Sequence, residues 1–95
     1  MAIKRIHFLV HGDVQGVFFR KFTVEKATSH SLTGYVRNIG NGKVEGEAQG
    51  EEESIKHFLK DLDKGPLAAH VIRVDKTDKE VLEGEGEFRK VKNVR

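Results

Sequence analysis

The sequence contains no cysteine, and no apolar stretch in it approaches the length of a membrane span. Without cysteine, a disulfide, a thiolate nucleophile and a thiolate metal site are all impossible. The apolar stretch near the N-terminus, residues 8–10, is far too short for the core of a signal peptide. We therefore expect a soluble cytoplasmic protein with no membrane partner.

The sequence also has little net charge: 17 basic side chains against 15 acidic ones give +2. Proteins that follow a nucleic-acid backbone gather positive charge on one face. Here the densest charged run is acidic, between Glu45 and Glu53, and the only basic concentration is the C-terminal tail. We interpret that tail (Arg89, Lys90, Lys92, Arg95) as a solvated chain end and expect no nucleic-acid partner.

A chain of 95 residues has room for one domain, which we place at residues 1–95. Residues 3–11 alternate apolar and polar side chains, which predicts a half-buried strand. Residues 12–16 contain two glycines and predict a loop. A helix is expected from about residue 19 to residue 30, and a second strand from residue 32 to residue 39.

The Asn41-Gly42 pair predicts a tight hairpin turn, because both central residues of such a turn favour positive φ. Residues 43–49 then form the returning strand. The clearest helix follows, since one apolar stripe has the 0, 3, 4, 7 spacing: Ile55, Phe58, Leu59, Leu62. Residues 69–76 predict a fourth strand, and residues 84–91 a short final one.

This order of elements is typical of a ferredoxin-like βαββαβ α+β sandwich, in which two helices cover one face of a mostly antiparallel sheet. In that topology the first two strands are parallel, with the third strand between them. The loop after the first strand and the end of the second strand are then neighbours. We expect the chemistry of the protein at that edge.

The first stretch at this edge runs from Gly12 to Arg20. A loop with two glycines before a helix can point successive N–H groups at an anion, and the helix N-terminus adds partial positive charge. Arg20, in the first helical turn, has a planar charged fork that suits phosphate oxygens. By itself this loop is a weak signal, because ordinary turn geometry also explains the glycines, and the Gly-Lys-Ser/Thr ending of a P-loop is missing.

The second stretch runs from Gly34 to Gly50 and has Asn38 at the end of the predicted second strand. A carboxamide both donates and accepts hydrogen bonds, so Asn38 can hold a water molecule in line for attack. The alternative is that an Asn before a turn bonds only to local backbone.

Together the two stretches closely resemble the signature segments of the acylphosphatase family. Gly12 to Arg20 is similar to the Gly-x-Val-Gln-Gly-Val-x-Phe-Arg loop. Gly34 to Gly50 is similar to the Gly-aromatic-x-basic-Asn-x3-Gly-x-Val-x5-Gly segment. The similarity extends over nearly the whole chain, including Lys64-Gly65-Pro66.

The resemblance implies a small stand-alone enzyme that hydrolyses acyl phosphates without a metal or cofactor. It implies that Asn38 orients the nucleophilic water and that Arg20 is the second catalytic residue. It places phosphate binding on Arg20 and the loop N–H groups, at Gln15, Gly16, Val17, Phe18, Phe19 and Arg20. The expected partners are a small acyl phosphate and inorganic phosphate, the latter as product and competitive inhibitor, and the expected state is a monomer.

Three positions depart from the commonest family pattern. Asp13 puts an acidic group beside the phosphate loop, and Phe18 is bulkier than the small residue often found there. Ser31 stands where a helix-ending glycine is usual, which affects local stability rather than chemistry.

Three other functions fit the sequence less well: a metal site, an RNA-binding module and a non-catalytic domain. Among the five histidines, His7 and His11 lie roughly 13 Å apart on an extended strand, too far for one metal ion. An RNA-binding module of this fold needs aromatic residues on its central strands, and residues 43–49 contain none. A non-catalytic anion-binding regulatory domain of the same fold is the remaining alternative, and Asp13 is the feature that favours it.

Overall fold

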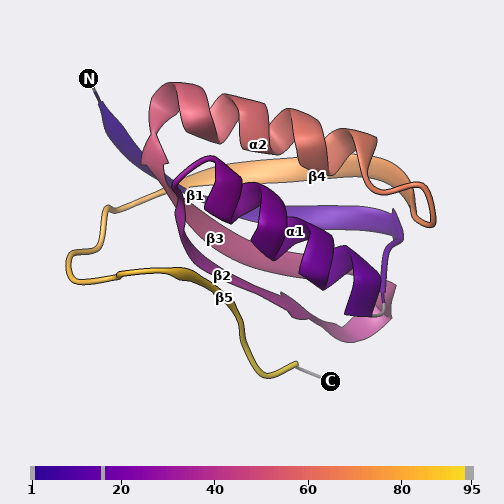
Figure 1. Cartoon of the computed structure of the whole chain (residues 1–95). Helices are drawn as coiled ribbons and strands as arrows, with labels where there is room; N and C mark the ends of the chain where they lie inside the picture. The colour runs from indigo at the N-terminus through magenta and orange to yellow at the C-terminus, as the bar shows by residue number, and fades with distance from the viewer. Residues whose placement is uncertain (1, 16, 94–95) are drawn as a thin grey trace.

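The computed structural model describes residues 2–15 and 17–93. One five-stranded sheet has both helices on the same face (Figure 1). The elements in chain order are β1 (Ile3–Asp13), α1 (Val17–Ser29), β2 (Thr33–Asn38), β3 (Val44–Glu51), α2 (Glu52–Lys64), β4 (His70–Lys79) and β5 (Phe88–Lys90). Neither helix in the described residues has the length and apolar character needed to cross a membrane.

The strand order is β4-β1-β3-β2-β5. Both β1 and β2 are antiparallel to β3, so they run parallel to each other on its two sides. This confirms the predicted ferredoxin-like α+β fold. The short β5 adds an edge strand parallel to β2, with Gly34 opposite Phe88.

The core lies between the sheet and the two helices. The alternating residues Ile6, Phe8 and Val10 of β1 are buried there, as their period-two spacing predicts. Phe58 of α2 packs edge-on against Phe8, with ring centroids 5.5 Å apart. The predicted apolar stripe of α2 is confirmed: Ile55, Phe58 and Leu62 are buried, and Leu59 packs against the core.

The segment between β1 and α1 is shorter than the sequence predicts. Strand β1 continues to Asp13 through an irregularity in the pairing between His11 and Gly12, and α1 begins at Val17. Gly12 has φ of 137°, and a Cβ there would overlap the carbonyl of His70 on β4. The first glycine therefore permits close approach of two strands rather than forming the loop.

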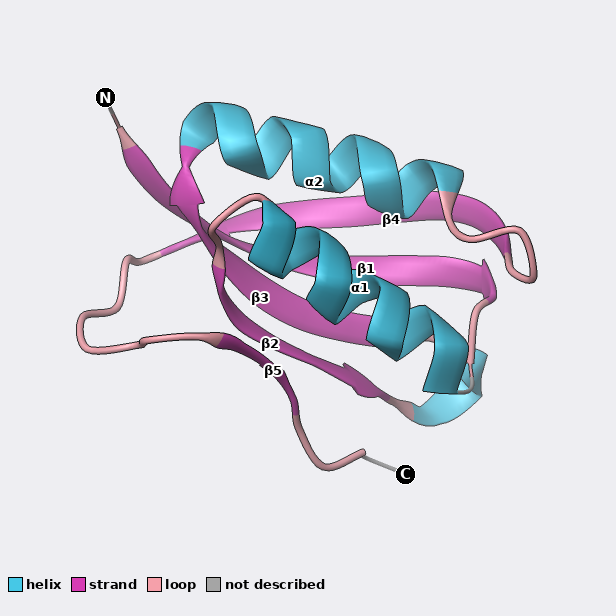
Figure 2. Ribbon diagram, in the orientation of Figure 1, coloured by secondary structure: helices cyan, strands magenta, loops and turns pink. Residues whose placement is uncertain are grey.

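The turn between β2 and β3 has the predicted backbone. A short 3-10 turn (Gly40–Gly42) connects the strands, and φ is positive at both Asn41 (69°) and Gly42 (75°). This turn and the N-terminus of α1 lie at the same end of the sheet (Figure 2). The topology thus brings the two motif-bearing stretches together.

Candidate active site

The end of β2 and the start of α1 form the candidate site. Side chains alternate along β2, so Asn38 shares with Gly34 and Val36 the sheet face that the helices cover. Tyr35 and Arg37 belong to the opposite, open face. Asn38 is therefore on the same side of the sheet as Arg20, which lies in the first turn of α1.

Arg20 and Asn38 each contain a buried polar atom without a hydrogen-bond partner among the described residues. These atoms are Nε of Arg20 and Oδ1 of Asn38. A buried polar group left unsatisfied costs about 1–3 kcal/mol, so native structures rarely leave one without a reason. One atom is a cationic donor and the other an acceptor, which is the pair that a bound anion and a water molecule would satisfy.

A third side chain connects these two residues. Oδ1 of Asn93 accepts a hydrogen bond from Nη1 of Arg20 at 3.2 Å and one from the backbone N–H of Asn38 at 3.1 Å. Both donors are therefore within hydrogen-bond distance of one oxygen. The sequence does not predict a role for Asn93, because the C-terminal tail has the composition of a solvated chain end. The tail reaches the candidate site only because β5 pairs with β2.

The side chain of Gln15 contacts the β2–β3 turn. Its Nε2 donates to the carbonyl of Ile39 at 2.7 Å and to that of Lys43 at 3.2 Å. The Lys43 carbonyl also accepts the backbone N–H of Ile39, at 3.0 Å. The carboxamide of Gln15 thus joins the loop to the turn, which leaves its backbone N–H as the group that fits the predicted role in phosphate binding.

The other residues predicted to bind phosphate lie in or next to the first turn of α1. Gly16 lies outside the described residues. Phe19 is buried in the core, whereas the Phe18 side chain is 72% exposed. The N–H groups of the first helical residues have no partner within the helix, and in α1 these include Val17, Phe18 and Phe19. The structure thus assembles helix N–H groups beside the arginine.

A cavity of about 90 Å³ lies directly beside the segment that connects β1 to α1. Asp13, Gln15 and Phe18 line it from the loop side, and Pro66 and Ala69 from the segment after α2. Asp13, the acidic departure from the family pattern, is exposed at the end of β1.

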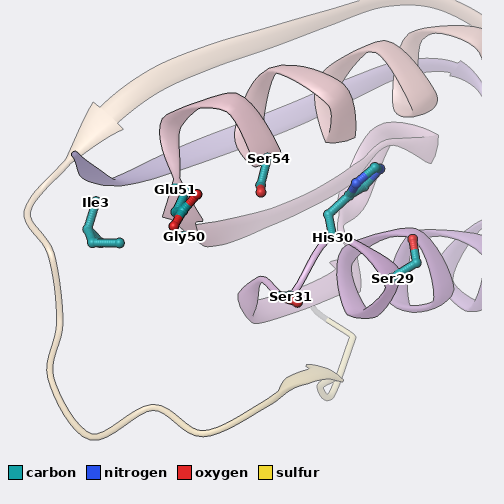
Figure 3. A pocket seen from close by; sticks show the side chains of 7 residues that line it. All are labelled: Ile3, Ser29, His30, Ser31, Gly50, Glu51 and Ser54. Carbon is teal, nitrogen blue, oxygen red and sulfur yellow. The ribbon is translucent and has the colours of Figure 1, made fainter. Parts of the chain in front are cut away.

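A larger cavity lies at the other end of the sheet, where α1 ends and α2 begins (Figure 3). It has a volume of about 490 Å³, and His30, Glu51 and Ser54 are among its lining residues. His30 is already hydrogen-bonded to Asp61, at 2.8 Å. Neither Arg20 nor Asn38 lines this cavity, so it is separate from the candidate site.

Charged side chains on the open face of the sheet form ion pairs. Glu45 contacts Arg37 (Nε–Oε2, 2.7 Å) and His7 (Nε2–Oε1, 2.8 Å). Burial alone would raise the pKa of Glu45, but the hydrogen bonds from His7 and Arg37 outweigh it and lower that pKa. Glu47 is likewise paired, with the buried Arg5 at 2.6 Å. This network explains the acidic strand β3 by structure rather than by acid–base chemistry.

Comparison with known proteins agrees with the two motifs and with the fold. The acylphosphatase family model matches residues 6–90. An acylphosphatase of Moorella thermoacetica is 46% identical over 94% of this chain and 95% of its own length. One from Geobacillus thermodenitrificans is 41% identical over 92% and 93% of the two chains. The crystal structure of acylphosphatase from Bacillus subtilis superposes with a TM-score of 0.88 at 32% identity, covering 94% of this chain and 99% of the other. The chain therefore belongs to the acylphosphatase family.

Proposed function

We propose that Arg20 and the N–H groups at the start of α1 hold the phosphate of an acyl phosphate, while Asn38 positions the water that attacks it. The family match makes the chain an acylphosphatase, a hydrolase of acyl phosphates. The observation that carries the residue roles is a pair of buried atoms at one end of the sheet, Arg20 Nε and Asn38 Oδ1, neither of which is hydrogen-bonded to a described residue.

The Nε–H of Arg20 is the guanidinium donor that we expect to bind the phosphate. Nη1 is engaged by Asn93, whereas Nε has no partner among the described residues. Nε–H and one Nη2–H lie on a single edge of the guanidinium, and that edge can bond two phosphate oxygens at once. Helix N–H groups and the positive end of the helix dipole add to the attraction of the dianion.

Asn38 suits the water because its side-chain oxygen has no hydrogen-bond partner within residues 2–15 and 17–93. In the proposed step this oxygen accepts one hydrogen bond from the water, and the water oxygen attacks phosphorus in line with the acyl oxygen. The P–O bond to the acyl group breaks and a carboxylate leaves. Both protons of the water remain on the phosphate, one on the attacking oxygen and one on another phosphate oxygen. The products are therefore a carboxylate and dihydrogen phosphate.

Few catalytic groups are needed for this reaction. A carboxylate leaves without being protonated, so a strong general acid is unnecessary. Catalysis of phosphoryl transfer consists mostly of positioning and electrostatic stabilisation. Removing one preorganised donor at a developing charge typically costs about 3–4 kcal/mol, which corresponds to a factor of a hundred or more in rate.

Hydrolysis of benzoyl phosphate in the presence of a chelator tests the proposal. The native chain should turn the substrate over, and inorganic phosphate should inhibit it competitively. Arg20→Gln should lower turnover by at least about a hundredfold. Arg89→Gln, which changes an exposed arginine on β5, serves as the matched control and should retain native turnover.

The outcomes separate the proposal from its alternative. Full activity of Arg20→Gln would contradict the role assigned to this residue. If phosphate raised the melting temperature of the native chain but no acyl phosphate were hydrolysed, the non-catalytic anion-binding domain would be the correct interpretation.

A further inference from the structure

The chain beyond β5 continues alongside β2 toward the candidate site. The backbone N–H of Gly34 donates to the carbonyl of Glu87 at 3.2 Å, and that of Val91 donates to the carbonyl of Val36 at 3.0 Å. The next group of β2 that faces this edge is the N–H of Asn38, and its acceptor is the side-chain oxygen of Asn93. A side chain of the tail thus takes the place of a backbone carbonyl at the end of the ladder.

The same oxygen accepts the hydrogen bond from Nη1 of Arg20. A carboxamide oxygen has two lone pairs, so these two donors use its full accepting capacity. One bond comes from the first turn of α1 and the other from the last residue of β2. Asn93 therefore links the two elements that carry the proposed catalytic residues.

The contact also determines which edge of the guanidinium is available. Nη1 is on the opposite side of the group from the Nε–H. A bond from Nη1 to the tail therefore leaves the Nε/Nη2 edge free to bind a phosphate. The acceptor is a neutral amide, so it orients Arg20 without the negative charge that would oppose a bound dianion.

We propose that Asn93 is a positioning residue: its side-chain oxygen holds Arg20 and Asn38 in the arrangement that binds phosphate and aims water at it. This inference rests on the proposed function above. It assigns a role to the C-terminal tail, which contributes no group that reacts.

The first test compares Asn93→Ala with Lys92→Ala, a control at the neighbouring exposed position of the same tail. Asn93→Ala should lower kcat for benzoyl phosphate about tenfold, the scale of one lost hydrogen bond to a charged group. Its melting temperature should change little, because Asn93 is exposed. Lys92→Ala should keep native values of both. A native kcat for Asn93→Ala would overturn the proposal, and so would an increased one, which would mean that the tail competes with substrate for Arg20.

Asn93→Asp provides the conservative variant. It retains an acceptor oxygen at the same place, so kcat should recover to within a few-fold of the native value. The added charge should raise KM for the dianionic substrate, and salt should reduce this effect. If kcat for Asn93→Asp were as low as for Asn93→Ala, positioning by the oxygen would be contradicted.

Binding of inorganic phosphate, measured by calorimetry, gives a readout that does not depend on turnover. Asn93→Ala should bind phosphate several-fold more weakly than the native chain and Lys92→Ala. If the native chain binds phosphate but hydrolyses nothing, the proposed function fails while this comparison still decides the role of Asn93. Equal phosphate affinity in all three proteins would overturn it.

Discussion

Gln15 and Ile39 are joined across the candidate site by a hydrogen bond of 2.7 Å from the Gln15 side chain to the Ile39 carbonyl. The two residues are 24 positions apart in the sequence, one before α1 and the other after β2. This bond couples the position of the loop to the position of the turn that follows Asn38. The carboxamide of Gln15, a residue of the first motif, therefore has a structural role.

Replacing Gln15 by alanine should therefore affect activity more than stability. Gln15→Ala removes both bonds to the turn, and we expect kcat/KM for benzoyl phosphate to fall about tenfold, the scale of one or two such hydrogen bonds. Gln49→Ala is a matched control, because Gln49 also makes two side chain–backbone bonds, both to Leu82 and far from the site. It should lower the urea midpoint yet leave kcat/KM unchanged. Equal losses of activity in both variants would contradict the assignment.

Asn38→Ala should separate turnover from phosphate binding. The variant loses the oxygen that holds the water but keeps Arg20 and the helix N–H groups, so kcat should fall by at least about a hundredfold. The rise in melting temperature caused by inorganic phosphate should persist. Asn41→Gly is a suitable control, since Asn41 is exposed and its φ of 69° suits glycine. If Asn38→Ala lost turnover and the phosphate effect together, Asn38 would be structural.

Most of the fold could be predicted from local patterns. The stripe of α2 and the alternation of β1 are set by which side chains must be buried, and their periods appear directly in the sequence. The Asn41-Gly42 turn was predictable because few residues accept positive φ. Once the order of elements indicates the topology, the meeting of Arg20 and Asn38 at one end follows from strand order.

What could not be predicted depends on long-range contacts. Asp13 pairs with β4 because Gly12 lets the backbones of β1 and β4 approach closely. No pattern within β1 predicts this pairing. The sequence predicted eight residues for the last strand, whereas β5 contains only Phe88–Lys90. The position of Asn93 follows from the pairing of this short strand with β2, for which the tail carries no periodic signal.

The open-face network should make stability depend on pH below neutrality. The pKa of Glu45 lies below its ordinary value of 4.5 in the folded state. The unfolded chain therefore binds more protons in acid, and the stabilisation, complete above pH 4.5, is lost as the pH falls through the folded pKa. Glu45→Gln should be less stable than the native chain at pH 7, by about 1 kcal/mol. The two urea midpoints should converge toward pH 2.

Glu83→Gln is the control for this experiment, because Glu83 is exposed and outside the network of Glu45. Its midpoint should follow that of the native chain at every pH. The urea midpoints of Glu45→Gln and the native chain could instead differ by the same amount from pH 7 to pH 2. That result would show that the lost stability comes from packing rather than from the ionised carboxylate.

Ser31 should be a site where glycine stabilises the protein. Its φ is 60°, in the left-handed region, and the adjoining N–H of Leu32 bonds back to the carbonyl of Ala27 at 2.9 Å to close α1. Left-handed backbone costs a residue with a side chain about 1–2 kcal/mol, and the greater entropy of unfolded glycine cancels part of the gain from removing it. Ser31→Gly should thus raise the free energy of unfolding by about 0.5–1 kcal/mol, measured by urea denaturation. Ser54→Gly, inside α2, should do the opposite, because glycine there lowers helix propensity by a similar amount. If both variants were destabilised alike, the backbone at Ser31 would not be the cause.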